Sequence, residues 1–386
     1  MDLPNKSSSP FTIAKATPDE SVYTWTRHQP FWGPQHTQQS YITRESKLLT
    51  YRLTKNGGLT TWILTDTNNN HDGETNTTTN RTIFSSLETY RKRAIVRGTD
   101  GLVRDVIAYG VASVFTPEEH RRQGYAAKML SLLGETLSAW QSGEAGSAEF
   151  SVLFSDIGRN FYAQQQWMPF PSTHLSFATK PFRTDLDNRL TLITDDNLQT
   201  VAELDEQTMR KKIATPPIGP HKVRVAILPD FATYEWHLAR ARCLTSHLLG
   251  RTPTVHGAIY TPPGLPNSRI WMLWSCDVYG GKDKLEENVM HILHFALEDD
   301  KISNEELTKA FRSIMGVVHN NAHEWFCPKI NMWNPDDRTK TLVNNLVDLQ
   351  ADFIVRQKSN ITSLRWFGEG PVSEVEWVDN QRFEWC

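Results

Sequence analysis

A strand-to-helix junction near residue 120 limits the folds open to this sequence more than any other segment. Residues 104–115 are rich in β-branched and aromatic side chains and predict a strand. Residues 125–140 carry apolar side chains every three or four positions and predict a helix. The helix begins directly after Arg121-Arg122-Gln123-Gly124, where the glycine lets the backbone approach a ligand closely. Such a helix start presents unpaired N–H groups and a positive dipole end, so we expect it to bind an anion such as a pyrophosphate.

The first half of the chain predicts a sheet built mainly from hairpins. Residues 67–82, nearly all Asn, Thr, Asp and Gly, predict a long solvated loop. Alternating and β-branched segments predict strands, one pair of them around the turn Asn56-Gly57-Gly58. The predicted strands are 11–17, 47–54, 60–66, 82–97, 104–115, 151–154 and 174–178, and helices are predicted from residue 18 and over 125–140 and 159–166.

The second half predicts another mixed α/β region beyond a polar stretch at residues 181–188. We place the domain boundary there, giving an N-terminal domain over 1–180 and a C-terminal domain over 181–386. The predicted helices are 196–212, 234–249, 285–298 and 304–315, and the predicted strands are 224–228, 255–260 and 269–278.

Composition excludes several classes of protein. With 386 residues and 39% hydrophobic residues, the chain can bury a sizeable core, so dominant disorder is excluded. A net charge of -3 lacks the basic excess of a nucleic-acid surface. The four cysteines form no CxxC pair, so neither a zinc site nor a disulfide framework is expected. The amino terminus does not resemble a signal sequence and no apolar run is long enough to span a membrane, so we expect a cytoplasmic protein without a membrane partner.

The junction matches neither the Rossmann nor the P-loop pattern, but it resembles the acetyl-CoA pyrophosphate loop of the GNAT acetyltransferase superfamily. Arg121, Gly124 and Ala126 fill the defining positions of R/Q-x-x-G-x-G/A. About forty residues later, Tyr162 stands where the superfamily has a tyrosine in L/F-Y-x-x-x-G-F, although Gln166 and Trp167 replace its usual Gly and Phe. The resemblance implies a GNAT fold with a mixed, largely antiparallel sheet and acetyl-CoA as co-substrate.

Further segments resemble the fungal lysine N-acetyltransferases of lysine catabolism, which carry an extra C-terminal domain. These segments include Leu87-Glu-Thr-Tyr-Arg91, Val225-Ala-Ile-Leu-Pro-Asp230, Glu235-Trp-His237, Ser363-Leu-Arg-Trp366 and Glu384-Trp-Cys386. The resemblance implies a small amine as acceptor, with the ε-amino group of free lysine as the leading choice. It also implies a second mixed α/β domain that completes the acceptor pocket and could itself be GNAT-like.

The resemblance assigns roles to named residues. Backbone N–H groups near Val114 and Phe115 would polarise the thioester oxygen. Tyr162 would protonate the departing thiolate, although it could be an ordinary tyrosine of an amphipathic helix. The remaining residues expected to hold the cofactor are Arg121, Arg122, Gln123, Gly124, Tyr125, Ala126 and Asn160.

The acceptor amine is protonated at neutral pH, so a base must take a proton from it. We expect Glu88 to do this, with His120 as the alternative; Glu88 could instead pair with a neighbouring arginine for structure alone. Tyr90 and Arg91 are candidate substrate-binding residues, although strand alternation sends Arg91 to the face opposite Glu88 and Tyr90.

We therefore predict direct attack of a bound amine, without an acetyl-enzyme and without a metal. His291 and His294 have a spacing compatible with a metal, but no third ligand accompanies them. Two alternatives remain: an acetyltransferase for a secondary-metabolite or toxin amine, and a degenerate CoA-binding or scaffold protein. We expect a monomer or a weak homodimer.

Overall fold

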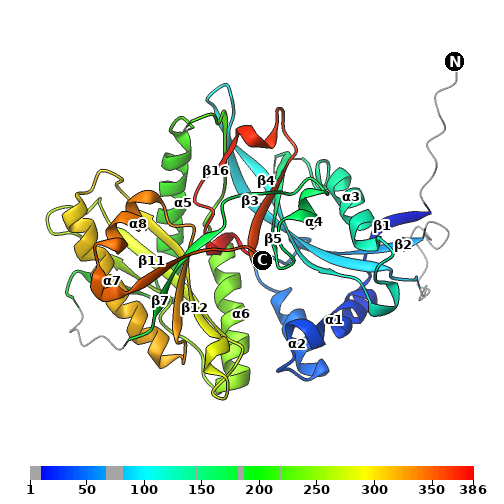
Figure 1. Cartoon of the computed structure of the whole chain (residues 1–386), viewed down its shortest axis with the longest axis horizontal. Coiled ribbons are helices and arrows are strands. Elements are labelled where there is room, and N and C mark those ends of the chain that lie inside the picture. Colours follow the sequence, from blue (N-terminus) through cyan, green and yellow to red (C-terminus); the bar gives the residue numbers. More distant parts are fainter. Residues whose placement is uncertain (1–9, 67–80, 144–145, 181–186, 218) are drawn as a thin grey trace.

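The computed structural model describes residues 10–66, 81–143, 146–180, 187–217 and 219–386 and divides them between two sheets (Figure 1). Most of the predicted loop at 67–82 therefore lies outside the described residues. The first half contributes β1 (Phe11–Lys15), α1 (Pro18–Trp32), α2 (Gln38–Leu48), β2 (Leu59–Asp66), β3 (Ser85–Arg97), β4 (Val103–Phe115), α3 (Tyr125–Leu137), β5 (Ala148–Ser155), α4 (Asn160–Ala163), β6 (Met168–Pro169) and β7 (Thr173–Ala178).

The second half has a matching series of elements. They are β8 (Leu190–Ile193), α5 (Leu198–Ala214), β9 (Val223–Ile227), α6 (Phe231–Leu249), β10 (Gly257–Tyr260), β11 (Ile270–Val278), β12 (Asn288–Leu297), α7 (Asn304–Glu324), β13 (Lys329–Trp333), α8 (Asp337–Asn344), β14 (Ala351–Val355), β15 (Ile361–Trp366) and β16 (Val375–Trp377). A 3-10 turn, η6 (Arg382–Glu384), precedes the last residues, which lie at the centre of the molecule (Figure 1).

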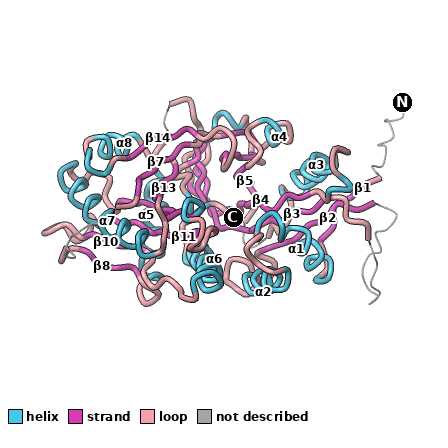
Figure 2. Tube along the Cα trace, turned by 60° about the horizontal axis from the view of Figure 1, so that its bottom comes forward, coloured by secondary structure: helices cyan, strands magenta, loops and turns pink. Residues whose placement is uncertain are grey.

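The two sheets share one topology. The first has the order β1-β2-β3-β4-β5-β15-β6, and the second has β8-β10-β11-β12-β13-β7-β14. In each sheet one neighbouring pair of this series is parallel, β4 with β5 and β12 with β13, and the other neighbours are antiparallel. The pair β9 and β16 extends the first sheet beside the far end of β3. Figure 2 shows the strands of both sheets between flanking helices.

The halves also exchange a strand. β15 of the second half lies between β5 and β6, and β7 of the first half lies between β13 and β14. The division predicted at residue 180 stays a prediction, because each sheet contains a strand from the other side of that position. Each exchanged strand buries apolar side chains in the other half, which ties the two halves into one body.

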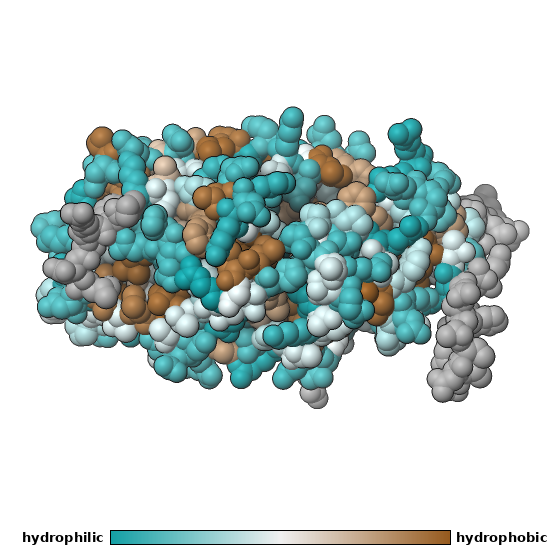
Figure 3. All heavy atoms as spheres, turned by 90° about the horizontal axis from the view of Figure 1, so that it is seen from below, coloured by the Kyte–Doolittle hydropathy of each residue, from teal (hydrophilic) through white to brown (hydrophobic). Residues whose placement is uncertain are grey.

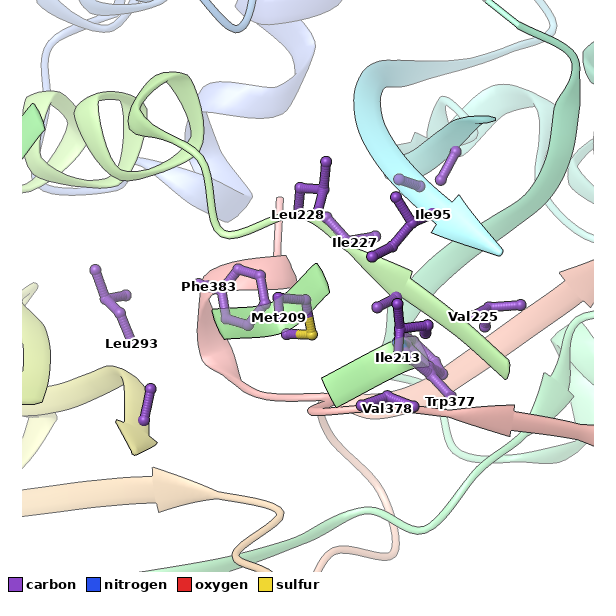
Figure 4. Close-up of a cluster of buried hydrophobic side chains, with 14 of the residues drawn as sticks. Ile95, Met209, Ile213, Val225, Ile227, Leu228, Leu293, Trp377, Val378 and Phe383 are labelled. Atoms are coloured by element: carbon purple, nitrogen blue, oxygen red, sulfur yellow. The ribbon is translucent and has the colours of Figure 1, made fainter. Parts of the chain in front are cut away.

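The core consists of separate apolar clusters packed on the faces of the two sheets. α3 packs on the first sheet through Met129, Leu130, Leu133 and Leu137, and α7 packs on the second sheet. Between the sheets, α5 contributes Met209 and Ile213 to a cluster with strand residues of both halves, shown in Figure 4. In the face shown in Figure 3, the hydrophobic residues among those coloured form small patches on a mostly hydrophilic surface.

Two predicted elements are wrong. Residues 285–298 form not a helix but mainly β12, because this strand is covered on both faces and its nearly continuous burial removes the alternation that marks a half-exposed strand. Residues 47–54 form the end of α2 and turns, and β1 takes the place beside β2 that this segment was expected to fill. The helix predicted at 159–166 is shorter and spans Asn160–Ala163.

Among the helices of the described residues, none combines the length and apolar content needed to cross a membrane.

Candidate active site

A cleft opens where β4 and β5 separate. The parallel pairing of these strands ends at Val111 and Leu153, and a cavity of about 630 Å³ begins beyond that point. We call it the N-terminal cleft. Both halves of the chain line it, through α1, α2, β3, β4, β5 and α4 on one side and α6 and the last residues on the other.

A β-bulge in β4 shapes the wall of this cleft. Glu88 pairs with Ala112 and Ser86 pairs with Phe115, so Ser113 and Val114 together face a single residue of β3. Ser113 has a φ of 53°, a left-handed conformation that costs a non-glycine residue free energy. The bulge takes Ser113 and Val114 out of the regular ladder with β3, beyond the end of pairing with β5. Val114, a predicted cofactor residue, therefore lines the cleft at a point where the backbone of β4 is not paired with a neighbouring strand.

Glu88 is the buried carboxyl of the N-terminal cleft, with 4% of its surface exposed. Ser113 Oγ donates a hydrogen bond to its Oε2 at 2.8 Å, and Trp25 Nε1 donates to its Oε1 at 3.1 Å. Burial and the nearby Glu45 charge raise the pKa of Glu88 to about 7, although these two hydrogen bonds and Arg44 oppose the shift. A carboxyl with a pKa near neutrality is suited to exchange protons with an amine.

Tyr162 reaches the same cleft from α4, on the other side of the gap between the strands. Burial, assisted by the Asp156 charge, raises the pKa of Tyr162 to about 12. The phenol therefore holds its proton at neutral pH and can pass it on when another group supplies a proton in return. Tyr90 also lines the cleft, where its ring packs edge-on against Trp236 with 5.2 Å between centroids.

The predicted phosphate loop is exposed and open. Gly124 is the N-cap of α3 with a φ of 80°, and an added Cβ there would meet nothing within 4 Å. The helix begins without a side-chain cap, and the first bond onto Gly124 comes from the Lys128 N–H. The amides of residues 125–127 thus have no acceptor within the helix and remain available to an anion.

The other predicted cofactor residues surround this loop. Arg121 lies over the rings of Phe31 and Phe115 at 5.4 and 5.8 Å and donates to the Thr116 carbonyl at 3.1 Å. Arg122 is exposed with a φ of 64°. Gln123 accepts a hydrogen bond from the Tyr125 hydroxyl at 3.2 Å, and Ala126 is half-buried in the first turn of α3. Asn160 is exposed at the start of α4.

Of the predicted residues, Glu88, Tyr90, Val114 and Tyr162 line the cleft, whereas the phosphate-loop residues, Asn160, Arg91, His120 and Phe115 do not. Arg91 is on the face of β3 opposite Glu88, as strand alternation requires. It pairs with Tyr109 of β4, and its charge opposes the rise that burial causes in the pKa of Tyr109. His120, the alternative base, packs against Phe84 and Tyr125. Phe115 packs against His28, Phe31 and Trp32 near the mouth.

Sequence reasoning missed two arginines that line the cleft. Arg240 of α6 donates to Asp277 at 3.1 Å and to the Tyr279 hydroxyl, and its guanidinium lies 4.6 Å above the Trp385 ring. Arg44 of α2 pairs with Glu45 and lies over Tyr41. No local motif marks these residues, because they are brought to the cleft only by contacts between distant segments.

In the described part of the chain, no three His, Cys, Asp or Glu side chains gather as metal ligands. The two histidines with the suggestive spacing have separate partners. His291 Nε2 lies 3.5 Å from Asp277, whereas His294 Nδ1 lies 2.9 Å from Asp205.

Comparison with known proteins gives a consistent picture. A family described as the LYC1 GNAT-like C-terminal domain matches residues 174–386. A protein of Yarrowia lipolytica named lysine acetyltransferase is 23% identical over 232 residues, which are 50% of this chain and 57% of that protein. The match thus spans little more than half the length of that relative.

Two solved structures share the fold. A probable N-acyltransferase from Enterococcus faecalis aligns with a TM-score of 0.53 at 10% identity, over 92% of this chain and 72% of the other. A GCN5-related N-acetyltransferase from Anabaena variabilis aligns with a TM-score of 0.51 at 12% identity, over 93% and 73%. Both alignments extend across the two sheets described above.

Proposed function

The chain belongs to the LYC1 GNAT-like family, and on that basis we propose that it is an acetyl-CoA-dependent N-acetyltransferase whose acceptor is the ε-amino group of free L-lysine. The predicted GNAT resemblance and the predicted fold class are confirmed by the family match and by the two structural neighbours. The acceptor rests on the name of the Yarrowia lipolytica relative and on the chemistry of the N-terminal cleft.

The observation that carries the proposal is the position of Glu88. Its carboxyl is buried beside the bulge of β4, on a wall of the cleft that also holds Val114. The open phosphate loop follows the same strand, and Tyr162 enters from α4. A base, a proton donor and a pyrophosphate site are thus arranged around the place where two parallel strands part.

The reaction then uses these groups in order. Glu88 accepts one proton from the substrate ammonium, which frees the nitrogen lone pair. The nitrogen attacks the thioester carbon while the backbone N–H group at Val114, which the bulge frees from the ladder, stabilises the oxygen. Phe115, the other residue expected to do this, stays paired with Ser86 outside the cleft lining. As the C–N bond forms and the C–S bond breaks, Tyr162 gives its proton to the thiolate and recovers one from the nitrogen. The products are the N-acetyl amine and free CoA, and the enzyme returns to its starting state once Glu88 releases its proton to solvent.

A free amino acid also presents a carboxylate, and Arg240 is the proposed partner for it. Arg240 lines the N-terminal cleft from the second half, with one face of the guanidinium stacked on Trp385. Guanidinium binds carboxylate through parallel hydrogen bonds. This role replaces the one expected for Arg91, whose side chain lies on the far face of β3.

The proposal is tested by assaying release of CoA thiol with lysine and with a panel of other amines, followed by mass spectrometry of the products. We expect Nε-acetyllysine with a higher kcat/KM than any other product. A product formed only from an amine that is not an amino acid would favour the secondary-metabolite alternative. Binding of acetyl-CoA in calorimetry without thiol release from any amine would favour the scaffold alternative.

A further inference from the structure

The second sheet contains its own cleft at the position equivalent to the active site. Parallel pairing of β12 with β13 ends at Ile292 and Met332, as that of β4 with β5 ends at Val111 and Leu153. A cavity of about 460 Å³ lies beyond this point, lined by the end of β12, the start of α8 and the inner face of α5. We call it the C-terminal cleft.

The C-terminal cleft lacks the features that would bind a pyrophosphate. The link from β12 to α7 carries Glu298, Asp299 and Asp300 where the first half has two arginines and a glycine. The first turn of α7 is already capped, because Ser303 Oγ accepts a hydrogen bond from the Glu306 N–H at 3.2 Å. Glu305 and Glu306 in that turn occupy the positive end of the dipole. An anion is therefore disfavoured at this helix.

The inner wall of the cleft offers buried acceptors. Asp205 is fully buried; its Oδ2 accepts from Tyr234 at 2.5 Å and contacts His294 at 2.9 Å, while its Oδ1 has no partner among the described residues. Asn380, with 7% of its surface exposed, lines the same cleft, and its Oδ1 also lacks a partner in that part of the chain. Buried acceptors left without donors cost free energy, and a ligand with N–H groups would remove that cost.

The charges around these acceptors fit the same ligand. Lys212 Nζ is held by Asp379 Oδ1 at 2.6 Å, and Glu298 is held by Arg269. Lys211 and Lys301 also line the cleft but are exposed to solvent, and carboxylates outnumber cationic side chains along its wall. The interior is therefore acceptor-rich, and the basic side chains nearest to it, Lys212 and His294, are paired with Asp379 and Asp205.

We propose that the C-terminal cleft is a binding site for a small aliphatic amine in its ammonium form, with Asp205 and Asn380 as the buried acceptors. Unlike the equivalent cleft in the first half, it lacks the groups that would bind an anion, and its lining favours a cation. The site does not depend on which amine the N-terminal cleft acetylates.

The wall of this site continues into the active site. Trp377 and residues 379–381 line the C-terminal cleft, and Trp385 and Cys386 line the N-terminal one. Between them, the Phe383 ring packs on His294 with 4.7 Å between centroids, and its carbonyl contacts His237 at 2.8 Å. A bound amine therefore contacts the segment that closes the acceptor side of the active site.

The test is calorimetric titration of the full chain with 1,5-diaminopentane. Thr208 of α5 lines the C-terminal cleft, and its hydroxyl bonds only to the Leu204 carbonyl of its own helix among the described residues. Thr208→Trp fills the cleft, whereas Thr208→Val keeps the side-chain size and is the matched control. We expect Thr208→Trp to lose one diamine site, with affinity there at least about tenfold weaker, and Thr208→Val to bind like the wild type.

Asn380→Leu is a second variant that removes an acceptor without filling the cleft, and it decides the outcome if Thr208→Trp does not fold. It should weaken the same site by about tenfold. Equal diamine binding by wild type, Thr208→Trp and Asn380→Leu would overturn the proposal, as would no diamine binding to the wild type. Titration with CoA tests the alternative that the C-terminal cleft binds an anion. Binding of a second CoA per wild-type chain that is absent in Thr208→Trp would support that alternative and contradict the proposal.

Discussion

In the first half of the molecule β4 leads into Arg121-Arg122-Gln123-Gly124, whereas in the second half the equivalent β12 leads into Glu298-Asp299-Asp300. Both strands continue past the point where their parallel pairing ends, and both are followed by a helix packed on their sheet. One helix starts open at a left-handed glycine, and the other is capped by Ser303 and flanked by carboxylates. The topology forms a cleft in each sheet, and we propose that the residues at the edge of each cleft determine which ligand it binds.

The strongest way to break this comparison is to remove the base from the N-terminal cleft. Glu88→Gln keeps the shape and the hydrogen-bonding capacity of the side chain but cannot accept a proton. We expect kcat/KM to fall about 1000-fold, within the usual range for loss of a general base. Steady-state assays check this, with Glu203→Gln on the exposed face of α5 as a control that keeps full activity. A Glu88→Gln enzyme with near-normal turnover would remove Glu88 from the mechanism.

The proton donor gives the next largest effect. Tyr162→Phe keeps the ring and removes only the hydroxyl, so we expect kcat to fall about 100-fold while acetyl-CoA affinity stays nearly unchanged. Single-turnover kinetics and calorimetry measure the two quantities separately. An unchanged kcat would mean that solvent, not Tyr162, protonates the thiolate.

The pH dependence follows from the raised pKa of Glu88. Because Glu88 must be ionised to accept a proton, kcat/KM should rise about tenfold between about pH 6 and 8, around an apparent pKa near 7. The same shift affects stability with the opposite sign. A folded-state pKa above the unfolded value gives stability that is complete below about pH 4.5 and is lost as pH rises through 7.

Glu88→Gln should remove this loss of stability, which is on the order of 3 kcal/mol for a shift of this size. The variant should therefore be at least as stable as wild type at pH 8, although it is nearly inactive. Urea unfolding at two pH values measures the difference. A variant clearly less stable than wild type at pH 8 would show that Glu88 serves the fold through its charge.

The phosphate loop can be tested with matched glycines. Gly124 and Gly250 have φ values of 80° and 69°, and an added Cβ at either would meet nothing within 4 Å. Each alanine substitution should cost about 1 kcal/mol of backbone strain. Only Gly124→Ala should also raise KM for acetyl-CoA, about fivefold, because the backbone amides of the residues that follow Gly124 must align with the pyrophosphate. Equal KM values in the two variants would argue against this loop as the cofactor site.

The smallest effect is expected from an exposed charge. Arg122→Gln should raise KM for acetyl-CoA about threefold at low salt and less at high salt, since exposed charges are screened. Lys211→Gln, at the rim of the C-terminal cleft, is the matched change in the other half and should leave KM unaltered. If Lys211→Gln raised KM for acetyl-CoA as much as Arg122→Gln does, both clefts would interact with the cofactor.

The sequence predicts the first cleft better than the second for a physical reason. Arg121, Gly124 and Tyr162 belong to local patterns, a helix start and a short motif, so neighbouring residues in the sequence are enough to predict them. Arg240 and Trp385 enter the N-terminal cleft only through packing between segments far apart in the chain. The exchange of β7 and β15 is likewise set by long-range pairing, which hydrophobic periodicity does not encode.

The mistaken helix at 285–298 has a related cause. β12 lies between α5 on one face and α7 on the other, so its residues are buried almost continuously and period two disappears. With that strand read as a helix, the equivalence of β12 to β4 cannot be seen from the sequence. His291 and His294 then look like neighbours on one helix face, although they contact different carboxylates.

The most direct measurement is a titration of the wild-type chain, Gly124→Ala and Thr208→Trp with CoA. One CoA should bind per wild-type chain, Gly124→Ala should weaken that binding, and Thr208→Trp should leave it unchanged. Two equivalents of CoA, or a single equivalent that Thr208→Trp abolishes and Gly124→Ala does not affect, would contradict the assignment of the two clefts.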